Sequence, residues 1–190
     1  MKVEFVGSFT GVNLPELPYP EIAVAGRSNV GKSSFVNAVL ERHKIARVSS
    51  TPGMTRTINL YLCEQRFILA DLPGYGYSKA PKFERERWAH DMEIYFRTRT
   101  RLKGCVLLVD VRHFPLKIDL DAIEWLRSFN HDLLIVLTKC DKLKRAELVR
   151  VEREIAGLGF DRSIEYRMFS AKTGLGKKEV LSWIMKRIET

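Results

Sequence analysis

The chain has few of the features that mark secreted, membrane-spanning or lipid-anchored proteins. It has only three cysteines, Cys63, Cys105 and Cys140, and no two of them form a CxxC unit. We therefore expect reduced, mostly buried cytosolic thiols. The first 20 residues lack the apolar core of a signal peptide, no apolar run is long enough to span a membrane, and the C-terminus carries no prenylation cysteine. These absences predict a cytoplasmic protein without a membrane anchor.

Acidic residues are also relatively few. The 190 residues include 32 Lys and Arg against 23 Asp and Glu, which gives a net charge of +9. Such an excess favours polyanionic partners, either nucleic acid or an anionic membrane surface, although solubility alone is an alternative explanation. The length and the 45% hydrophobic content indicate a single globular domain with a sizeable core.

Short apolar runs alternate with helix-like stretches along most of the chain. Six runs predict strands buried on both faces of a mostly parallel sheet: Ile22–Ala25, Ile58–Cys63, Phe67–Ala70, Cys105–Val109, Leu133–Leu137 and Tyr166–Phe169. A hairpin around Glu64-Gln65 would put one antiparallel strand at the sheet edge. The pattern predicts a three-layer α/β domain over residues 21–190, preceded by a lead-in segment, residues 1–20, in which Val3 to Val6 favours a short strand.

A glycine-rich motif follows the first of these runs. Residues 26–34 read GRSNVGKSS and match GxxxxGK[ST] between a predicted strand and a predicted helix. Glycines let the backbone wrap round phosphate oxygens, and N–H groups at the helix N-terminus supply partial positive charge. We expect Lys32 to reach the β and γ phosphates and the Ser33 hydroxyl to bind magnesium. The predicted contacts are Gly26, Arg27, Ser28, Asn29, Val30, Gly31, Lys32, Ser33 and Ser34. The alternative, a glycine-rich turn with an exposed lysine, fits the strand–loop–helix context poorly.

A second motif, Asp71-Leu72-Pro73-Gly74 or DxxG, directly follows the run Phe67–Ala70. Alone the motif is weak, because Asp before a Pro-Gly turn is common. Its place at the carboxyl end of a strand, where α/β sheets bind ligands, strengthens it. We expect Asp71 to hold magnesium through water and the Gly74 N–H to sense the γ-phosphate.

Two further loops could select the base. Thr138-Lys139-Cys140-Asp141 follows Leu133–Leu137, and the Asp141 carboxylate can accept hydrogen bonds from two guanine N–H groups that adenine lacks. The Lys139 stem can lie along the base. The alternative is that Asp141 only caps a helix over Lys142–Arg153. The loop Ser170-Ala171-Lys172 would add an Ala171 N–H for the guanine carbonyl and a bracing Ser170.

The polar stretch from His43 to Thr57 has no apolar periodicity and contains Pro52-Gly53. A hydroxyl there could close on magnesium when the γ-phosphate is present, which would make the domain a switch. Thr55 is the best candidate, and Ser50, Thr51 and Thr57 compete with it. The predicted nucleotide contacts in this segment are Gly53, Met54, Thr55, Arg56 and Thr57.

Together the motifs resemble the five G boxes of the EngB family (also called YihA or YsxC) of Era-like GTPases. The matching stretches are GRSNVGKSS, PGMTRTIN, DLPGYGYSKA, TKCD and SAK, and DLPGYGYSKA is the most family-specific. The resemblance implies a Ras-like P-loop GTPase fold, Thr55 as the magnesium ligand of the switch, and a role in assembling the large ribosomal subunit with a requirement in cell division and septation. One departure from the usual Asn-Lys-x-Asp box is Thr138, whose hydroxyl has less reach than a carboxamide, although EngB-like proteins commonly carry it.

The resemblance also bears on hydrolysis. Ras-like proteins place a water-orienting Gln after DxxG, where this chain has Tyr75, so we expect slow turnover, on the order of 10⁻⁴–10⁻² per second. The residues expected to act in hydrolysis are Lys32, Thr55 and Gly74. Asn29 occupies the position that binds potassium in cation-activated relatives, so K⁺ is a candidate second ion beside Mg²⁺. The alternative is that Asn29 only braces the loop.

Four basic groups are candidates for RNA contact. The first group ends the helix that carries Trp88 and consists of Arg97, Arg99, Arg101 and Lys103, and the second follows DxxG and consists of Lys79, Lys82, Arg85 and Arg87. The third follows Asp141 and consists of Lys142, Lys144, Arg145, Arg150 and Arg153. The fourth lies on the last helix and consists of Lys177, Lys178, Lys186 and Arg187. Part of this set is expected to be merely solvated. Of the four groups, we expect the one after DxxG to be gated by the bound nucleotide.

Three functions compete at this stage. We expect a monomeric GTP-gated factor that binds ribosomal RNA or the large ribosomal subunit. A division-site regulator acting through protein partners differs from it mainly in the partner. A small-molecule kinase could use the same phosphate loop, but the sequence offers no candidate acceptor site or lid.

Overall fold

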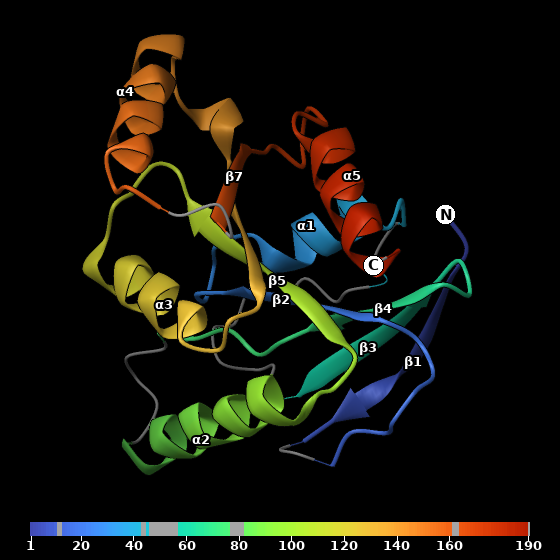
Figure 1. Ribbon diagram of the computed structural model, residues 1–190. Coiled ribbons are helices and arrows are strands. Elements are labelled where there is room, and N and C mark those ends of the chain that lie inside the picture. The colour runs from blue at the N-terminus through green and yellow to red at the C-terminus, as the bar shows by residue number, and fades with distance from the viewer. Residues whose placement is uncertain (11–12, 43–44, 46–56, 77–81, 161–163, 190) are drawn as a thin grey trace.

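The protein is described here from a computed structural model, which describes residues 1–10, 13–42, 45, 57–76, 82–160 and 164–189 (Figure 1). Its seven strands are β1 (Val3–Phe9), β2 (Glu21–Gly26), β3 (Ile58–Cys63), β4 (Phe67–Asp71), β5 (Leu102–Asp110), β6 (Asp132–Thr138) and β7 (Ile164–Met168). Its helices are α1 (Lys32–Val39), α2 (Lys82–Thr98), α3 (Lys117–Arg127), the 3₁₀ turn η1 (Cys140–Lys142), α4 (Arg145–Ala156) and α5 (Lys177–Ile188).

One sheet holds all seven of these strands, in the order β1-β3-β4-β2-β5-β6-β7. The strands β4, β2, β5, β6 and β7 are parallel, and β3 runs antiparallel to both of its neighbours. The predicted α/β class and hairpin are confirmed: Glu64 and Gln65 lie in the turn between Cys63 and Phe67, with left-handed φ of 52° and 54°.

The predicted strand count of six was wrong. Residues 3–9 pair with β3 along its whole length, so the antiparallel strand β3 lies second from the edge and β1 forms the edge. The sequence predicted a short strand at Val3 to Val6 but did not place it in the sheet, because its half-exposed residues do not form a continuous apolar run. The strand also continues to Phe9, beyond the predicted Val6.

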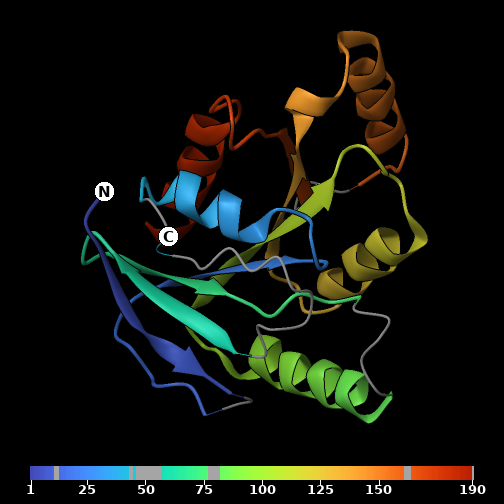
Figure 2. The same cartoon turned by 180° about the vertical axis from the view of Figure 1, so that it is seen from behind.

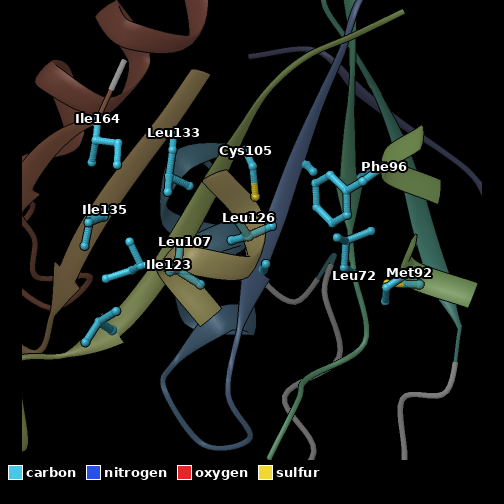
Figure 3. Packing of buried hydrophobic residues seen from close by; sticks show 14 of the residues in the cluster. Leu72, Met92, Phe96, Cys105, Leu107, Ile123, Leu126, Leu133, Ile135 and Ile164 are labelled. Carbon is cyan, nitrogen blue, oxygen red and sulfur yellow. The ribbon is translucent and has the colours of Figure 1, made fainter. Parts of the chain in front are cut away.

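Side chains of the central strands alternate between two cores. On one face, Ala23, Leu107 and Ile135 pack beneath α2, α3 and α4. On the other face, Val24, Leu108 and Val136 pack beneath α1 and α5. Figures 1 and 2 show these two helical layers from opposite sides, and Figure 3 shows part of the first core. The sheet is thus the middle layer of three, and the loops at the carboxyl ends of its parallel strands are brought to one edge.

The helices bury apolar residues against the sheet, and the thiols are buried as expected. Met92 and Tyr95 of α2, Val151 and Ile155 of α4, and Val180 and Ile184 of α5 are buried. All three cysteines are free and buried, and burial raises the pKa of each thiol. Among the described residues, no helix combines the length and the apolar character needed to cross a membrane.

Candidate nucleotide-binding site

A cavity of about 870 Å³ opens at the carboxyl ends of β2, β6 and β7. Gly31 and Asp141 both line it, so the phosphate loop and the predicted base loop contribute to one pocket. Eight predicted site residues line the cavity: Val30, Gly31, Ser34, Thr138, Lys139, Asp141, Ala171 and Lys172. Seven further residues complete the wall: Asn37, Ala38, Glu41, Arg42, Lys142, Phe169 and Lys177.

The phosphate loop runs from the end of β2 to the start of α1. Gly31 caps α1 with a φ of 102°, a left-handed conformation that favours glycine, and Lys32 begins the helix. Gly26 is required by packing, because a Cβ there would lie 2.8 Å from Val30 Cγ1. The Lys32 ammonium contacts the carboxylate of Asp71. The loop therefore places the N-terminus of α1 at the cavity wall, where Gly31 lies, and the Lys32 ammonium beside it in contact with Asp71. A helix N-terminus at this position is suited to anions.

The DxxG segment packs directly against this loop. Asp71 ends β4, which lies beside β2 in the sheet. The Ser28 N–H donates to the Tyr75 carbonyl at 3.0 Å, and the Tyr75 N–H donates to the Gly26 carbonyl at 3.2 Å. A Cβ on Gly74 would lie 3.3 Å from the Ser28 nitrogen, so glycine permits this close approach. The DxxG backbone and the phosphate loop are thus held as one unit.

The Tyr75 side chain leads away from the phosphate loop to α3. Its hydroxyl donates to Asp119 Oδ1 at 3.4 Å, and Arg27 Nε lies 4.0 Å from the same oxygen. Asp119 is fully buried, and burial raises the pKa of its carboxyl although Arg27 and Tyr75 act in the opposite direction. Sequence reasoning missed Asp119, because no motif places it near the DxxG segment.

Hydrogen bonds across the sheet edge define the base loop. The Thr138 hydroxyl donates to the Val30 carbonyl at 2.8 Å. A threonine, although its side chain is shorter than the usual asparagine, is therefore long enough to join this loop to the phosphate loop. The Ser170 hydroxyl donates to Asp141 Oδ1 at 2.7 Å, which is the bracing role predicted for Ser170. This bond is the largest cause that lowers the pKa of Asp141 below its ordinary value.

The helix-cap alternative for Asp141 was wrong. Asp141 lies within η1, and α4 begins later, at Arg145. The cap of α4 is formed at Lys144, whose N–H donates to the Glu147 carboxylate at 2.7 Å. The Asp141 carboxylate is therefore not used to cap α4.

A buried carboxylate that the sequence did not single out lies beside the base loop. Asp110 ends β5 and is 2% exposed. Its Oδ2 accepts a hydrogen bond from Lys139 Nζ at 2.9 Å, and Lys139 Nζ also donates to the Asn29 carbonyl at 2.8 Å. The only sequence signal for Asp110 was its place at the end of an apolar run, the position that Asp71 also has.

Several predicted residues do not line the main cavity, among them Lys32, Ser33 and Asp71 as well as Cys140, Leu72 and Pro73. The Cys140 thiol is buried against the Leu137 carbonyl and the Met168 sulfur, so only the Cys140 backbone can serve the base loop. Leu72 and Pro73 line a second, almost wholly apolar cavity of about 300 Å³ between α2 and α3. These residues therefore shape the loops rather than present side chains to the main cavity.

The predicted switch residues Gly53, Met54, Thr55 and Arg56, with the competitors Ser50 and Thr51, lie outside the described residues. Thr57 is described. Its hydroxyl lies 3.4 Å from Asn59 Oδ1, and Asn59 Nδ2 donates to Asp71 Oδ2 at 3.5 Å. Asn59 thus connects the start of β3 to the DxxG aspartate, a link that the sequence did not indicate.

Metal ligands are sparse within the described ranges, which contain no group of three or more His, Cys, Asp or Glu side chains able to hold an ion. Asn29 is exposed with a φ of 66°, and its side chain makes no hydrogen bond to another described residue. A bracing role for the Asn29 side chain therefore has no support from these contacts.

Comparison with known proteins agrees with this geometry. A family model described as 50S ribosome-binding GTPase matches residues 21–139. "Probable GTP-binding protein EngB" of Pediococcus pentosaceus is 46% identical over 175 residues, covering 92% of this chain and 90% of the relative. The protein of the same name from Petrotoga mobilis is 48% identical over 182 residues, covering 92% and 91%.

Solved structures give the same family. The crystal structure of a probable GTP-binding protein EngB superposes with a TM-score of 0.71 at 25% identity, covering 89% of this chain and 98% of that one. A variant of Era from Aquifex aeolicus bound to GDP.AlF4⁻ has a TM-score of 0.71 at 20% identity, over 90% of this chain and 57% of that one, a likeness of fold alone. The identities over nine-tenths of the chain and the match of residues 21–139 lead to one conclusion: the chain belongs to the EngB family of GTP-binding proteins, within the P-loop GTPases.

Proposed function

We propose that the main cavity binds GTP and GDP with Mg²⁺, and that the protein hydrolyses GTP slowly as a switch in assembly of the large ribosomal subunit. The observation that carries the binding proposal is that Gly31 and Asp141, 110 positions apart in the sequence, line the same cavity. One end of that cavity suits phosphates and the other suits guanine. Family membership supports the hydrolytic activity.

Phosphates would bind to backbone N–H groups of residues 26–34 and to the Lys32 ammonium. The Lys32 ammonium now contacts Asp71, and phosphate oxygens would replace that contact. The Ser33 hydroxyl and the Asp71 carboxylate are oxygen donors of the kind Mg²⁺ prefers, and Asp71 is 3% exposed at the end of β4. These residues fit Mg²⁺, which when bound would compensate charge on the phosphates. Thr55 is the third proposed ligand.

The base end would read guanine through Asp141. Its lowered pKa keeps the carboxylate ionised at neutral pH, so it can accept hydrogen bonds from the ring N–H and the exocyclic amino group of guanine. The Ala171 N–H would meet the guanine carbonyl, and the Lys139 stem would lie along the ring. Adenine would leave the carboxylate without a donor, which disfavours ATP.

Nucleotide titration tests this assignment. Wild-type protein is expected to bind GTP and GDP at least 100-fold more tightly than ATP, roughly the discrimination expected when a bound base covers a carboxylate without donating a hydrogen bond to it. Asp141→Asn is expected to shift preference from guanine to xanthine nucleotides, because an amide complements the extra xanthine carbonyl. Asp132→Asn is the matched control, since Asp132 pairs with Arg187 at the start of β6, the other end of the sheet. Tighter binding of ATP than GTP would end the GTPase proposal and favour the kinase alternative.

Slow hydrolysis is proposed because no side chain in the described loops resembles a water-orienting Gln. Tyr75, which follows DxxG, donates its hydroxyl to Asp119 instead. We expect turnover on the order of 10⁻⁴–10⁻² per second without a partner.

Potassium bound at Asn29 would supply positive charge near the γ-phosphate. The exposed Asn29 side chain supports this proposal, because no hydrogen bond to another described residue holds it. Turnover measured in potassium chloride and in sodium chloride tests it: a rise only in potassium, lost in Asn29→Ala, is expected, and equal rates in the two salts contradict it.

The ribosomal role is supported by the family description and the net charge of +9. Within the described ranges, Arg101, Lys103, Arg145 and Arg153 are exposed and make no ion pair with another described residue, so they can meet RNA phosphates at little cost. Arg99 is instead committed to a buried pair with Glu21 at 2.7 Å. In the proposed nucleotide-coupled group after DxxG, the side chains of Lys79, Lys82 and Arg85 lie outside what the structure describes. The fourth member, Arg87, is exposed, and its Nε lies 4.0 Å from Asp91 Oδ2.

Co-sedimentation with purified large ribosomal subunits in GTP, GDP and no nucleotide tests this role. We expect binding in GTP that weakens steeply with salt, because phosphate contacts release counterions. Equal binding in all three conditions would refute GTP gating. Absence of binding in any condition would favour the regulator of cell division and septation that acts through protein partners.

A further inference from the structure

Asp110 is a buried carboxylate that none of the proposed nucleotide contacts uses. It ends β5, between the strands β2 and β6 that lead into the phosphate loop and the base loop. It is 2% exposed, and a buried charge without partners would be strongly unfavourable. Its partners therefore indicate what it does.

Two cations hold the Asp110 carboxylate. Arg112 donates from Nε to Oδ1 at 2.9 Å and from Nη2 to Oδ2 at 2.7 Å, and its own N–H donates to Oδ1 at 3.1 Å. Lys139 Nζ donates to Oδ2 at 2.9 Å. Burial would raise the pKa of Asp110, but these hydrogen bonds outweigh it and hold the pKa well below its ordinary value. Asp110 is thus a fixed negative charge.

Lys139 is held at both ends. Its backbone has a φ of 63°, and its ammonium is shared between Asp110 Oδ2 and the Asn29 carbonyl of the phosphate loop. Between these ends the stem crosses the phosphate loop, since a Cβ on Gly31 would lie 3.6 Å from Lys139 Cε. The stem is therefore a fixed apolar strip between the phosphate loop and the base loop.

We propose that Asp110 is a positioning residue for the nucleotide base, which anchors the Lys139 ammonium so that its stem is ordered as a surface for the purine ring. The inference rests on the guanine-nucleotide site proposed above and adds a residue outside its motifs. A lysine side chain loses much rotamer freedom when it is ordered, and Asp110 imposes that loss before the nucleotide arrives.

This role differs from that of Asp141 in what it can discriminate. The stem touches the face of the ring, which is common to all purines and independent of the number of phosphates. Asp141 reads the exocyclic amino group, which inosine lacks. Loss of Asp110 is therefore expected to lower the affinity for GDP, GTP and IDP by the same factor. Loss of Asp141 is expected to change the ratio of GDP to IDP affinity.

Asp110→Asn tests the inference, with dissociation constants for GDP, GTP and IDP measured by displacement of a fluorescent GDP analogue. An amide keeps the size of the side chain but loses the charge, and we expect all three nucleotides to bind about tenfold more weakly, the effect of losing one charge-assisted hydrogen bond. Asp132→Asn, which removes a carboxylate at the opposite end of the sheet, is expected to change each constant less than twofold.

Three comparisons separate positioning from loop structure. Arg112→Gln removes the other partner of Asp110 and is expected to leave nucleotide affinity within twofold of wild type. Lys139→Met keeps an apolar stem without the ammonium and is expected to weaken all three nucleotides about tenfold. In the Lys139→Met background, Asp110→Asn is expected to lower nucleotide affinity by less than a further twofold, because both substitutions remove the same contact.

The inference is overturned if Asp110→Asn binds within twofold of wild type, if Arg112→Gln weakens binding as much as Asp110→Asn, or if the ratio of GDP to IDP affinity changes in Asp110→Asn. Wild-type affinity in Lys139→Met overturns it as well, even where Asp110→Asn does not fold. Failure of the wild-type protein to bind GDP at all would instead refute the proposed function, and this inference with it.

Discussion

The hydroxyl of Thr138 joins the base loop to the phosphate loop, and its removal gives a prediction with a calculable size. Thr138 is 3% exposed and donates to the Val30 carbonyl at 2.8 Å. Thr138→Val replaces the hydroxyl with a methyl group of similar volume, so it removes the bond without opening a cavity. The lost bond costs about 1 kcal/mol, and leaving a buried carbonyl unsatisfied raises the total to about 2 kcal/mol.

Thermal unfolding followed by circular dichroism measures this cost. For a chain of this length, about 2 kcal/mol corresponds to a decrease in Tm of about 4–8 °C. We also expect GDP to bind about fivefold more weakly and so to stabilise the variant less, because Val30 belongs to the phosphate loop. Thr98→Val, which removes a hydroxyl bonded to the Ile94 carbonyl on the exposed surface of α2, is the control. A Tm within 1 °C of wild type, with GDP affinity unchanged, would refute the reasoning.

Three other predictions concern buried carboxylates. Tyr75→Phe removes the hydroxyl that donates to Asp119, so unfolding free energy should fall by about 1–2 kcal/mol in urea titration, and GTP affinity should fall more than GDP affinity. Glu21→Gln leaves the Arg99 guanidinium buried without its carboxylate, so calorimetry should show a loss of about 3–5 kcal/mol with GDP affinity unchanged. The pKa of Asp110 is lower in the folded protein than in the unfolded chain, so its contribution to stability is complete above about pH 4 and is lost as pH falls. Urea unfolding of wild type and Asp110→Asn from pH 3 to 7 should show that the difference in their free energies of unfolding shrinks below that pH.

Each of these predictions has a control. Tyr19→Phe removes a hydroxyl bonded to exposed Gln65 and should not alter the ratio of GTP to GDP affinity. Tyr95→Phe removes the hydroxyl donor to Glu21 but keeps the ion pair with Arg99, so its cost should be smaller than that of Glu21→Gln. A pH-independent difference between wild type and Asp110→Asn would contradict the assigned charge state of Asp110.

The arrangement of the main cavity could be predicted because it depends on topology. A parallel strand delivers the residue after its carboxyl end to a common edge, so apolar runs followed by GRSNVGKSS, DLPG and TKCD were enough to bring Lys32, Asp71 and Asp141 to one edge. The strand β1 could not be recognised by the same argument. It is half exposed, and its pairing with β3 joins residues 49 to 60 positions apart in the sequence.

The residues that support the cavity could not be predicted, because their partners come from other elements. Asp110 meets Lys139 across neighbouring strands, and Asp119 meets Tyr75 from the first turn of α3. In the sequence, Asp119 is one acid among several at the start of an amphipathic helix, where acids are common for electrostatic reasons alone. Only the packing of α3 against the DxxG segment distinguishes it.

Asp110 and Asp119 support opposite sides of the phosphate loop, which limits how that loop can move. Asp110 holds Lys139 against the Asn29 carbonyl, while Tyr75, bonded to Asp119, exchanges backbone hydrogen bonds with Gly26 and Ser28. Asp110 is fixed by three hydrogen bonds from Arg112, whereas Asp119 has one long hydrogen bond from Tyr75 and an ion pair with Arg27 at 4.0 Å, so the DxxG side is the weaker attachment. A nucleotide-dependent movement would therefore begin at the Tyr75–Asp119 contact, while the base loop held by Asp110 stays in place. For this reason Tyr75→Phe should change the ratio of GTP to GDP affinity, and Asp110→Asn should not.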